Sequence, residues 1–253
     1  MLKTGIYVDA ENVRLFGGYG MRYDVLVELA NAGNSSLLRA NSYLAEDRTR
    51  TREDYEYRLK LYHYHDIVRQ CGFKVIKKYV KRFIDDEGVM TTKANADMDL
   101  AIDALQQARN LDRIILLTGD GDFIRLVIAL QNMGCRVEVI GFNNVSQELK
   151  EAADSYISGF LIPGLLPLSA EGSRRQRGTP AKYNQDRGFG FMRYHVLTED
   201  GLQTETVFFH CSKSNVANDV VFLDPGNIFE FDILQNPENN NRTEAVDITL
   251  LDT

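Results

Sequence analysis

The sequence predicts an α/β fold with a doubly wound, mainly parallel sheet and helices on both faces, followed by a small all-β barrel. Apolar runs typical of buried strands alternate with helical periodicities over the first 160 residues, which is the pattern of a parallel α/β sheet. Beyond about residue 177, short strands and turns replace the helices, as in small barrels. We therefore expect one domain over 1–160, a linker over 161–177 and a second domain over 178–253.

The expected elements of the first domain follow in chain order from their apolar spacing. Strands are short apolar runs, and helices carry apolar residues three or four positions apart. The expected strands are residues 5–8, 37–45, 73–80, 114–117 and 135–140. The expected helices are residues 23–32, 53–71, 96–108 and 123–133.

Composition limits the class of protein. The formal net charge of −7 is not that of a basic nucleic-acid-binding domain, although a local patch or a bound cation can reverse the field. The cysteines Cys71, Cys135 and Cys211 lack metal-ligand spacing and suit a reducing compartment. No uncharged run approaches the ~20 residues of a membrane helix. We expect a cytoplasmic protein with no membrane partner.

Two aspartates follow the apolar run at 114–117. That run stops at Thr118-Gly119, and Asp120 and Asp122 then lie between a strand end and a helix start. In open α/β sheets this carboxyl edge is where ligands bind. The structural alternative is that Asp120 is a turn residue and Asp122 a helix N-cap.

Further polar groups are expected at the same edge. Asp9 ends the first strand and Asn12 lies one turn further on, although such residues are common after strands. Asp97 lies near the centre of the apolar face of helix 96–108, where a lone carboxylate is costly unless it is paired or bound to a metal. The helix dipole is the structural alternative for this first-turn aspartate. That apolar face comprises Met98, Leu100, Ala101, Ala104, Leu105 and Ala108.

These acids indicate a metal site. Clustered carboxylates repel one another and are tolerated mainly where a hard cation such as Mg²⁺ or Mn²⁺ binds. Such an ion can activate water and neutralise a phosphodiester in the transition state. The expected ligands are Asp9, Asp97, Asp120 and Asp122. We expect Asp99 and Asp103 to be solvated, and His63 and His65 to be surface residues.

The order and spacing of three motifs resemble the NYN domain, a branch of the PIN-like nucleases. The motifs are Asp9-x-x-Asn12, Lys93 followed by Asp97-Met98-Asp99-Leu100-Ala101, and Thr118-Gly119-Asp120-Gly121-Asp122-Phe123. The resemblance implies a PIN-like fold, divalent metal on the four aspartates, and Asn12 orienting substrate or water in RNA cleavage. Ala94-Asn95-Ala96 replaces a shorter Gly-Val common in the family, so Asp99 remains an alternative ligand to Asp97.

Cations between these motifs are candidate substrate contacts. Arg48 and Arg50 lie in a polar loop after a strand, and Lys78 belongs to a basic cluster near residues 74–82. A basic cluster beside an acidic site would bind a phosphate backbone. The alternative is a solvated surface.

The second domain carries an aromatic pattern. Gly alternates with Phe189 and Phe191, so both rings emerge on one face of a strand, and Phe208 and His210 lie on another. Exposed rings can stack unpaired bases, whereas the alternative is a small core. The two strands resemble the RNA-binding motifs of cold-shock domains, which are OB-fold barrels. Lys182, where that family usually has a Trp, and Arg187 are expected to contact the same strand.

Both resemblances imply single-stranded RNA as the partner. The leading hypothesis is a metal-dependent ribonuclease whose barrel captures the strand. One alternative is an RNA-binding regulator that does not cleave and uses the first domain as a scaffold or dimerisation unit, which leaves a homo-oligomer open. Another is a metal-dependent phosphatase or deoxyribonuclease.

Overall fold

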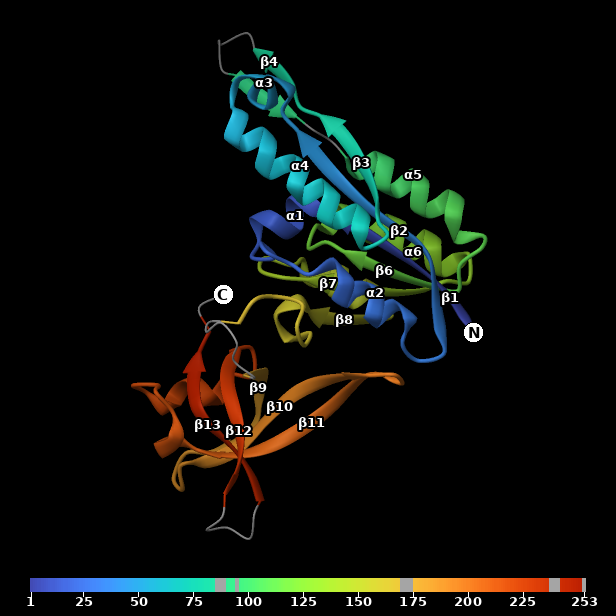
Figure 1. Cartoon of the computed structure of the whole chain (residues 1–253). Coiled ribbons are helices and arrows are strands. Elements are labelled where there is room, and N and C mark those ends of the chain that lie inside the picture. The colour runs from blue at the N-terminus through green and yellow to red at the C-terminus, as the bar shows by residue number, and fades with distance from the viewer. Residues whose placement is uncertain (85–89, 94–95, 169–174, 237–241, 252–253) are drawn as a thin grey trace. The chain divides into compact units, whose positions relative to one another are not determined.

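The computed structural model describes residues 1–84, 90–93, 96–168, 175–236 and 242–251 (Figure 1). The chain divides into two compact units. Unit 1 comprises Met1–Tyr19 and Tyr23–Ile157, and unit 2 comprises Gly20–Arg22 and Ser158–Thr253.

Unit 1 is built on a six-stranded sheet of order β3-β2-β1-β6-β7-β8. The pairs from β3 through β7 are all parallel, as the alternation of elements predicted. A separate antiparallel pair, β4 and β5, and the edge strand β8 were not predicted. The bounds are β1 Leu2–Asp9, β2 Ser35–Glu46, β3 Lys74–Tyr79, β4 Lys81–Ile84, β5 Met90–Lys93, β6 Arg113–Leu117, β7 Arg136–Gly141 and β8 Ser155–Ser158.

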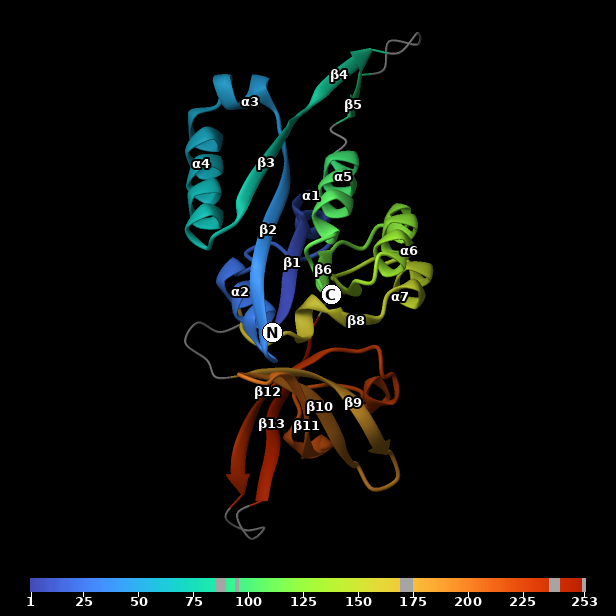
Figure 2. The same ribbon diagram turned by 90° about the vertical axis from the view of Figure 1, so that its right-hand side faces the viewer.

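Helices cover both faces of this sheet. Tyr23 of α2 bonds to Ser42 of β2 and to Tyr64 of α4 on one face. On the other face α5, α6 and α7 enclose the main core around Leu116, and Figure 2 shows α4 and α5 on opposite sides of β2 and β3. The bounds are α1 Ala10–Leu15, α2 Tyr23–Asn31, α3 Arg48–Glu53, α4 Tyr55–Gln70, α5 Asp97–Ala108, α6 Ile124–Asn132 and α7 Gln147–Ala152.

Helices α1, α3 and α7 were not predicted, because six residues are too few to show a helical period. Their N-caps are the detectable signal. The side chains of Asp9, Asp47 and Ser146 accept hydrogen bonds from backbone N–H groups in the first turns of α1, α3 and α7. The prediction that Arg48 and Arg50 lie in a loop was therefore wrong, since both lie on α3.

Three predictions about side-chain burial were also wrong. Met98 is 60% exposed, although the sequence placed it on the apolar face of this helix. The buried residues of α5 are Leu100, Ala104 and Ala108, so the buried face is narrower than predicted. Asp103 is not simply solvated, since it accepts a 2.9 Å hydrogen bond from the Tyr43 hydroxyl.

His65 is 1% exposed, although the sequence predicted a surface residue. Residues two apart on a helix point to different sides, so His63 faces solvent while His65 lies under α4 with Val68. Burial, together with the charge of Lys77, lowers the pKa of His65 to about 4. We conclude that this imidazole is a neutral core group at physiological pH.

Unit 2 contains a closed five-stranded barrel of order β10-β11-β13-β12-β9, an OB-like fold. β11 and β13 pair in parallel and the other neighbours are antiparallel. The barrel core includes Met192, Phe209 and Phe231. The bounds are β9 Gln176–Asn184, β10 Phe189–Thr198, β11 Gly201–His210, β12 Phe229–Asn236 and β13 Arg242–Leu250.

The basic end of the predicted linker is held by the barrel. Arg175 and Arg177 are each 10% exposed and contact the two carboxylate oxygens of Glu230, at 3.3 and 3.1 Å. Glu230 is itself 1% exposed. The neighbouring Arg174 lies outside the described residues. These two arginines are therefore occupied by an ion-pair network.

Candidate functional site

The carboxyl edge of the sheet brings the ends of β1 and β6 together. The two strands are neighbours, with Val8 opposite Leu117. The next residues are therefore adjacent, and the Thr118 hydroxyl donates to Asp9 Oδ2 at 3.2 Å. Thr118 is fully buried, and its oxygen also accepts from the Asp120 backbone N–H at 3.2 Å. Thr118 was quoted in the sequence motif without a role, and it connects the two acidic strand ends.

Asp9 combines burial with a structural role. Its side chain is the N-cap of α1 and accepts from the Asn12 backbone N–H at 3.1 Å. The residue is only 7% exposed. Burial, with a further contribution from the charges of Asp97 and Asp120, raises the pKa of Asp9 to about 6, although its two hydrogen bonds oppose the shift. Asp9 is thus a buried acid that faces other acids.

Asn12 holds the turn after β6. Its side-chain oxygen accepts the Gly119 backbone N–H at 2.8 Å. A Cβ on Gly119 would lie 3.3 Å from Val145 and 3.4 Å from this oxygen, so a larger residue would crowd the turn. Asn12 therefore positions the strand end that delivers Asp120 and Asp122.

Asp120 and Asp122 differ in role. Asp120, not Asp122 as the structural alternative held, is the cap: its Oδ1 accepts the Asp122 N–H at 2.9 Å at the start of the short 3-10 helix Gly121–Phe123. Asp120 is half-buried and Asp122 is exposed. The capping bond uses one oxygen of Asp120, and both carboxylates lie at the open edge.

Helix α5 contributes Asp97 to this group. Asp97 is the first residue of the helix and is half-buried. Burial raises its pKa, and the charges of Asp120 and Asp122 raise it further. The acids after β6 therefore contribute to the raised pKa values of both Asp9 and Asp97.

Asp99 belongs to a different set of contacts. Both of its oxygens accept from Lys78 Nζ, at 3.1 and 2.8 Å. Lys78 neutralises Asp99, whereas Asp97 has no cationic partner among the residues that the structure describes. Lys78 was predicted from the sequence to contact substrate, and in the structure its ammonium group is paired with Asp99.

The donor set suits a hard divalent cation in its chemistry. Carboxylate oxygens are ligands that Mg²⁺ and Mn²⁺ prefer, and the raised pKa values of Asp9 and Asp97 reflect burial first and the neighbouring negative charges second. Among the described residues, no three His, Cys, Asp or Glu side chains are close enough together to hold one ion. The residues therefore fit the ion by type and charge, while ligation needs side-chain movement.

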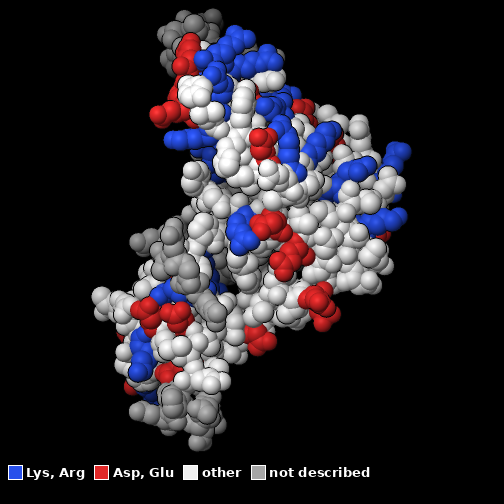
Figure 3. Space-filling model, in the orientation of Figure 1, with Lys and Arg blue, Asp and Glu red and all other residues white. Residues whose placement is uncertain are grey.

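Helix α3 carries two arginines, Arg48 and Arg50, that stack on tyrosine rings. The Arg48 guanidinium lies 3.4 Å from the centre of the Tyr79 ring, and Arg50 lies 4.2 Å from that of Tyr57. Such stacking orients an arginine. Arg50 Nε also lies 3.7 Å from Asp54 Oδ2. Figure 3 shows Lys and Arg side chains gathered over α3, α4 and β3.

The barrel presents an aromatic cluster on its outer face. Phe189 and Phe191 on β10 lie opposite His210 and Phe208 on β11. The Phe208 ring centre is 5.8 Å from that of Phe189 and 6.0 Å from that of Phe191. A Cβ on Gly190 would lie 2.3 Å from the Lys182 carbonyl oxygen, so glycine is required between the two rings.

Polar groups border this aromatic cluster. The Arg187 guanidinium lies 5.0 Å from the centre of the Phe189 ring. Lys182 is exposed and pairs with Phe191 across β9 and β10, and His210 Nδ1 lies 2.9 Å from the Ser212 hydroxyl. The sequence prediction that these residues share one region is consistent with this register.

No helix in the described part of the chain is long and apolar enough to cross a membrane.

Comparisons with known proteins point to one family. The family model described as the NYN domain matches residues 3–166. The Low amplitude and bright protein LabA of Synechococcus elongatus is 30% identical over 97 residues, which are 37% of this chain and 52% of LabA. The chain thus spans about half the length of this curated relative. A crystal structure of a protein of unknown function from Vibrio parahaemolyticus is 28% identical, with a TM-score of 0.51, covering 62% of this chain and 92% of that one.

Proposed function

The chain belongs to the NYN domain family, a nuclease-like family, and on that premise we propose that it is a metal-dependent ribonuclease. It hydrolyses phosphodiester bonds of single-stranded RNA, and its barrel binds the same strand. The observation that carries the proposal is the environment of Asp9, a buried carboxylate whose strongest charged neighbours are Asp97 and Asp120. Such a group favours a bound cation over an unpaired buried charge.

The four carboxylates would bind the ion, and two further residues keep them in position. Asp9, Asp97, Asp120 and Asp122 would hold Mg²⁺ or Mn²⁺, which supplies an activated water and charge neutralisation at phosphorus when bound. Thr118 keeps one Asp9 oxygen oriented, and Asn12 keeps the turn in place. These bonds restrict the acids before substrate arrives, which lowers the cost of ordering them.

The cations and the barrel would bind the substrate. Arg48 and Arg50, each stacked on a tyrosine, suit the phosphates of a strand. On the barrel, Phe189, Phe191 and Phe208 offer ring faces to unpaired bases. Phe191 is 40% exposed, so its ring is accessible to a base.

Cleavage of labelled single-stranded RNA with Mn²⁺ tests the proposal. We expect products from the natural protein, loss of products with EDTA, and loss in the double variant Asp97→Asn with Asp120→Asn. Asp66→Asn, an exposed acid on α4, is the matched control and should cleave normally. Cleavage that survives in the double variant would overturn this assignment of the site.

The barrel needs its own test. Stacking on an aromatic ring contributes about 1–3 kcal/mol per base. Phe191→Ala with Phe208→Ala should therefore weaken RNA binding about tenfold or more, as measured by fluorescence anisotropy. Val196→Ala, on the same strand outside the cluster, is the control. Equal affinities for the two variants would contradict stacking at this cluster.

A regulator that binds RNA without cleaving it is the second candidate. The separation of the carboxylates favours it, since among the described residues no three acids already meet. RNA binding that depends on a divalent ion, with no product under Mg²⁺ or Mn²⁺, would support this candidate. Cleavage of a 2′-deoxy strand but not of RNA would instead indicate a deoxyribonuclease.

A further inference from the structure

A continuous groove runs along α5 on the side of β2 and β3. Three hollows of about 380, 430 and 390 Å³ adjoin one another there. The first two share Arg39 and Gln107, and the last two share Lys74. We call this surface the α5 groove, lined chiefly by Lys3, Arg39, Lys74, Gln106, Gln107 and Asn110.

The groove arises from the sheet order. β3 and β2 form one edge of the sheet, and α5 packs over β1 and β2 near Tyr43, with the outer face of this edge left beside it. Side chains alternate along a strand, so Arg39 and Asn41 share the α5 side of β2 with Tyr43, whose hydroxyl bonds to Asp103 of α5. This face of the sheet edge therefore remains open along the helix.

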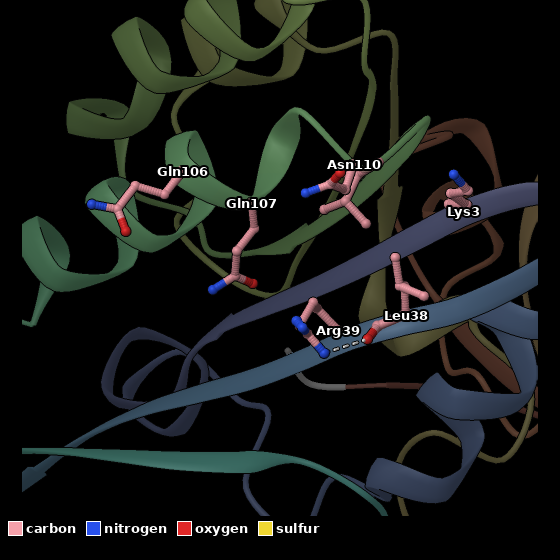
Figure 4. Close-up of a pocket in the computed structure, with 7 residues that line it drawn as sticks. Lys3, Leu38, Arg39, Gln106, Gln107 and Asn110 are labelled. Carbon is pink, nitrogen blue, oxygen red and sulfur yellow. Dashed lines mark hydrogen bonds between the residues drawn. The ribbon is translucent and has the colours of Figure 1, made fainter.

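Buried polar groups form the floor of the α5 groove. Asn41 is 2% exposed and donates to the Tyr43 hydroxyl at 3.0 Å. The hydroxyl of the fully buried Tyr7 donates to Gln107 Oε1 at 3.1 Å. Because that bond uses the oxygen of Gln107, its amide nitrogen is directed away from Tyr7, and Figure 4 shows the side chain projecting from α5 toward Arg39.

The chemistry of the lining matches a nucleic-acid strand. Lys3, Arg39 and Lys74 are exposed cations along the groove and suit phosphates. The third hollow also contains two acids: Asp99 is paired with Lys78, and Asp103 accepts a hydrogen bond from Tyr43. The amides of Gln106, Gln107 and Asn110 suit the hydrogen-bonding edges of unpaired bases. Ile102, 45% exposed in the third hollow, adds an apolar contact for a base face.

The groove ends beside the carboxylate site. Its third hollow includes Asp99, two residues from Asp97 on the same helix. The twelve residues of α5 span about 18 Å, close to five stacked nucleotides at ~3.4 Å each. A strand in the groove would thus run toward the first turn of α5, which carries Asp97.

We propose that the α5 groove binds the segment of single-stranded RNA that flanks the bond to be cleaved. The inference rests on the proposed function for its substrate, but it concerns a separate surface. An acidic peptide would satisfy the three cations, yet it would leave the amide row without its matching base edges. The groove therefore acts as a positioning surface that extends the substrate contact beyond the acids.

Binding to protein that cannot cleave tests the groove independently of catalysis. In the full chain carrying Asp120→Asn, we expect Arg39→Glu with Lys74→Glu to weaken binding of a 12-nucleotide RNA at least fivefold. Loss of two phosphate contacts should also lower the magnitude of the slope of log affinity against log salt by about 1.4.

A 4-nucleotide RNA is too short to occupy both the α5 groove and the carboxylate site, so the same groove variant should reduce its affinity less. The RNA carrying 4-thiouridine should crosslink to residues of α5 and β2.

The matched control is Lys60→Glu with Arg69→Glu, two exposed cations on α4, which covers the opposite face of the sheet. Equal affinity and salt slope for the groove and control variants would overturn the proposal. So would binding of a poly-glutamate peptide that the groove variant loses while RNA binding is unchanged. Absence of cleavage by the natural protein would refute the proposed function alone, because the binding comparison does not use catalysis.

Discussion

Asp9 in unit 1 and Glu230 in unit 2 are both almost completely buried acids, but their surroundings carry opposite charge. Glu230 lies between Arg175 and Arg177, so its burial is compensated within the fold. The charged groups that act most strongly on Asp9 are Asp97 and Asp120. The charge of Glu230 is compensated by cations of the fold, whereas the charge of Asp9 is offset only in part by two hydrogen bonds, which leaves it to favour a bound proton or cation.

The largest effect is expected where the compensation of Glu230 is broken. Arg175→Met removes one of its two cations and leaves a buried charge partly unpaired, so the free energy of unfolding should fall by about 3 kcal/mol or more. Urea unfolding followed by circular dichroism measures it. Arg14→Met, which removes an exposed pair with Glu11, should cost less than about 1 kcal/mol. Equal losses for both variants would remove the contrast between the two acids.

Removal of the charge on Asp9 is expected to raise the stability of the fold at neutral and higher pH, whereas removal of a partner of Glu230 lowers it. The pKa of Asp9 is raised from 3.8 to about 6, so the folded protein binds this proton more tightly than the unfolded chain does. The resulting stabilisation is complete below about pH 4 and is lost as pH rises through 6, a difference of about 3 kcal/mol. Asp9→Asn, which cannot ionise, should flatten this part of the profile and raise stability at pH 8.

Urea unfolding at pH values from 4 to 8 measures that effect. Asp66→Asn, an exposed acid, should keep the profile of the natural protein. An unchanged slope in Asp9→Asn would show that Asp9 is not the acid responsible.

A smaller effect is expected from the cation itself. Mn²⁺ at ten times its dissociation constant should stabilise the folded chain by about 1.4 kcal/mol, a shift of a few degrees in melting temperature. The double variant Asp97→Asn with Asp120→Asn should show no shift. A shift that persists in this variant would place the cation elsewhere.

The smallest effect on stability is expected at the partly exposed ion pair of Lys78 with Asp99. Lys78 and Asp99 are 40% and 36% exposed, so Lys78→Met should change stability by less than about 1 kcal/mol in the same urea experiment. A loss as large as that of Arg175→Met would mean that exposure does not distinguish these pairs.

Much of the fold could be predicted because it depends on local pattern. The strands β1, β2, β3, β6 and β7 and the four longer helices correspond to apolar periods in the sequence. The placement of Asp9 and Asp120 follows from the same pattern, since each ends a buried strand in a parallel sheet. The outward direction of Phe189 and Phe191 follows from the period of two along a strand.

Other features depend on contacts between distant segments and could not be predicted locally. The helical pattern favoured Asp97 over Asp99, but the ion pair of Asp99 with Lys78, which reaches α5 from β3, could not be predicted from that pattern. The burial of His65 depends on which side of α4 packs against the sheet, and a helical wheel does not identify that side when polar residues surround it.

The sequence by itself determined where the acids stand on the chain and which elements present them, because backbone geometry converts spacing into direction. Only the tertiary structure decided which carboxylates are neutralised by a cation of the chain, as Glu230 and Asp99 are, and which face one another, as Asp9 and Asp97 do. The physical reason is that charge compensation acts across space. It depends on the packing of residues that are far apart in the sequence, and no local period records it.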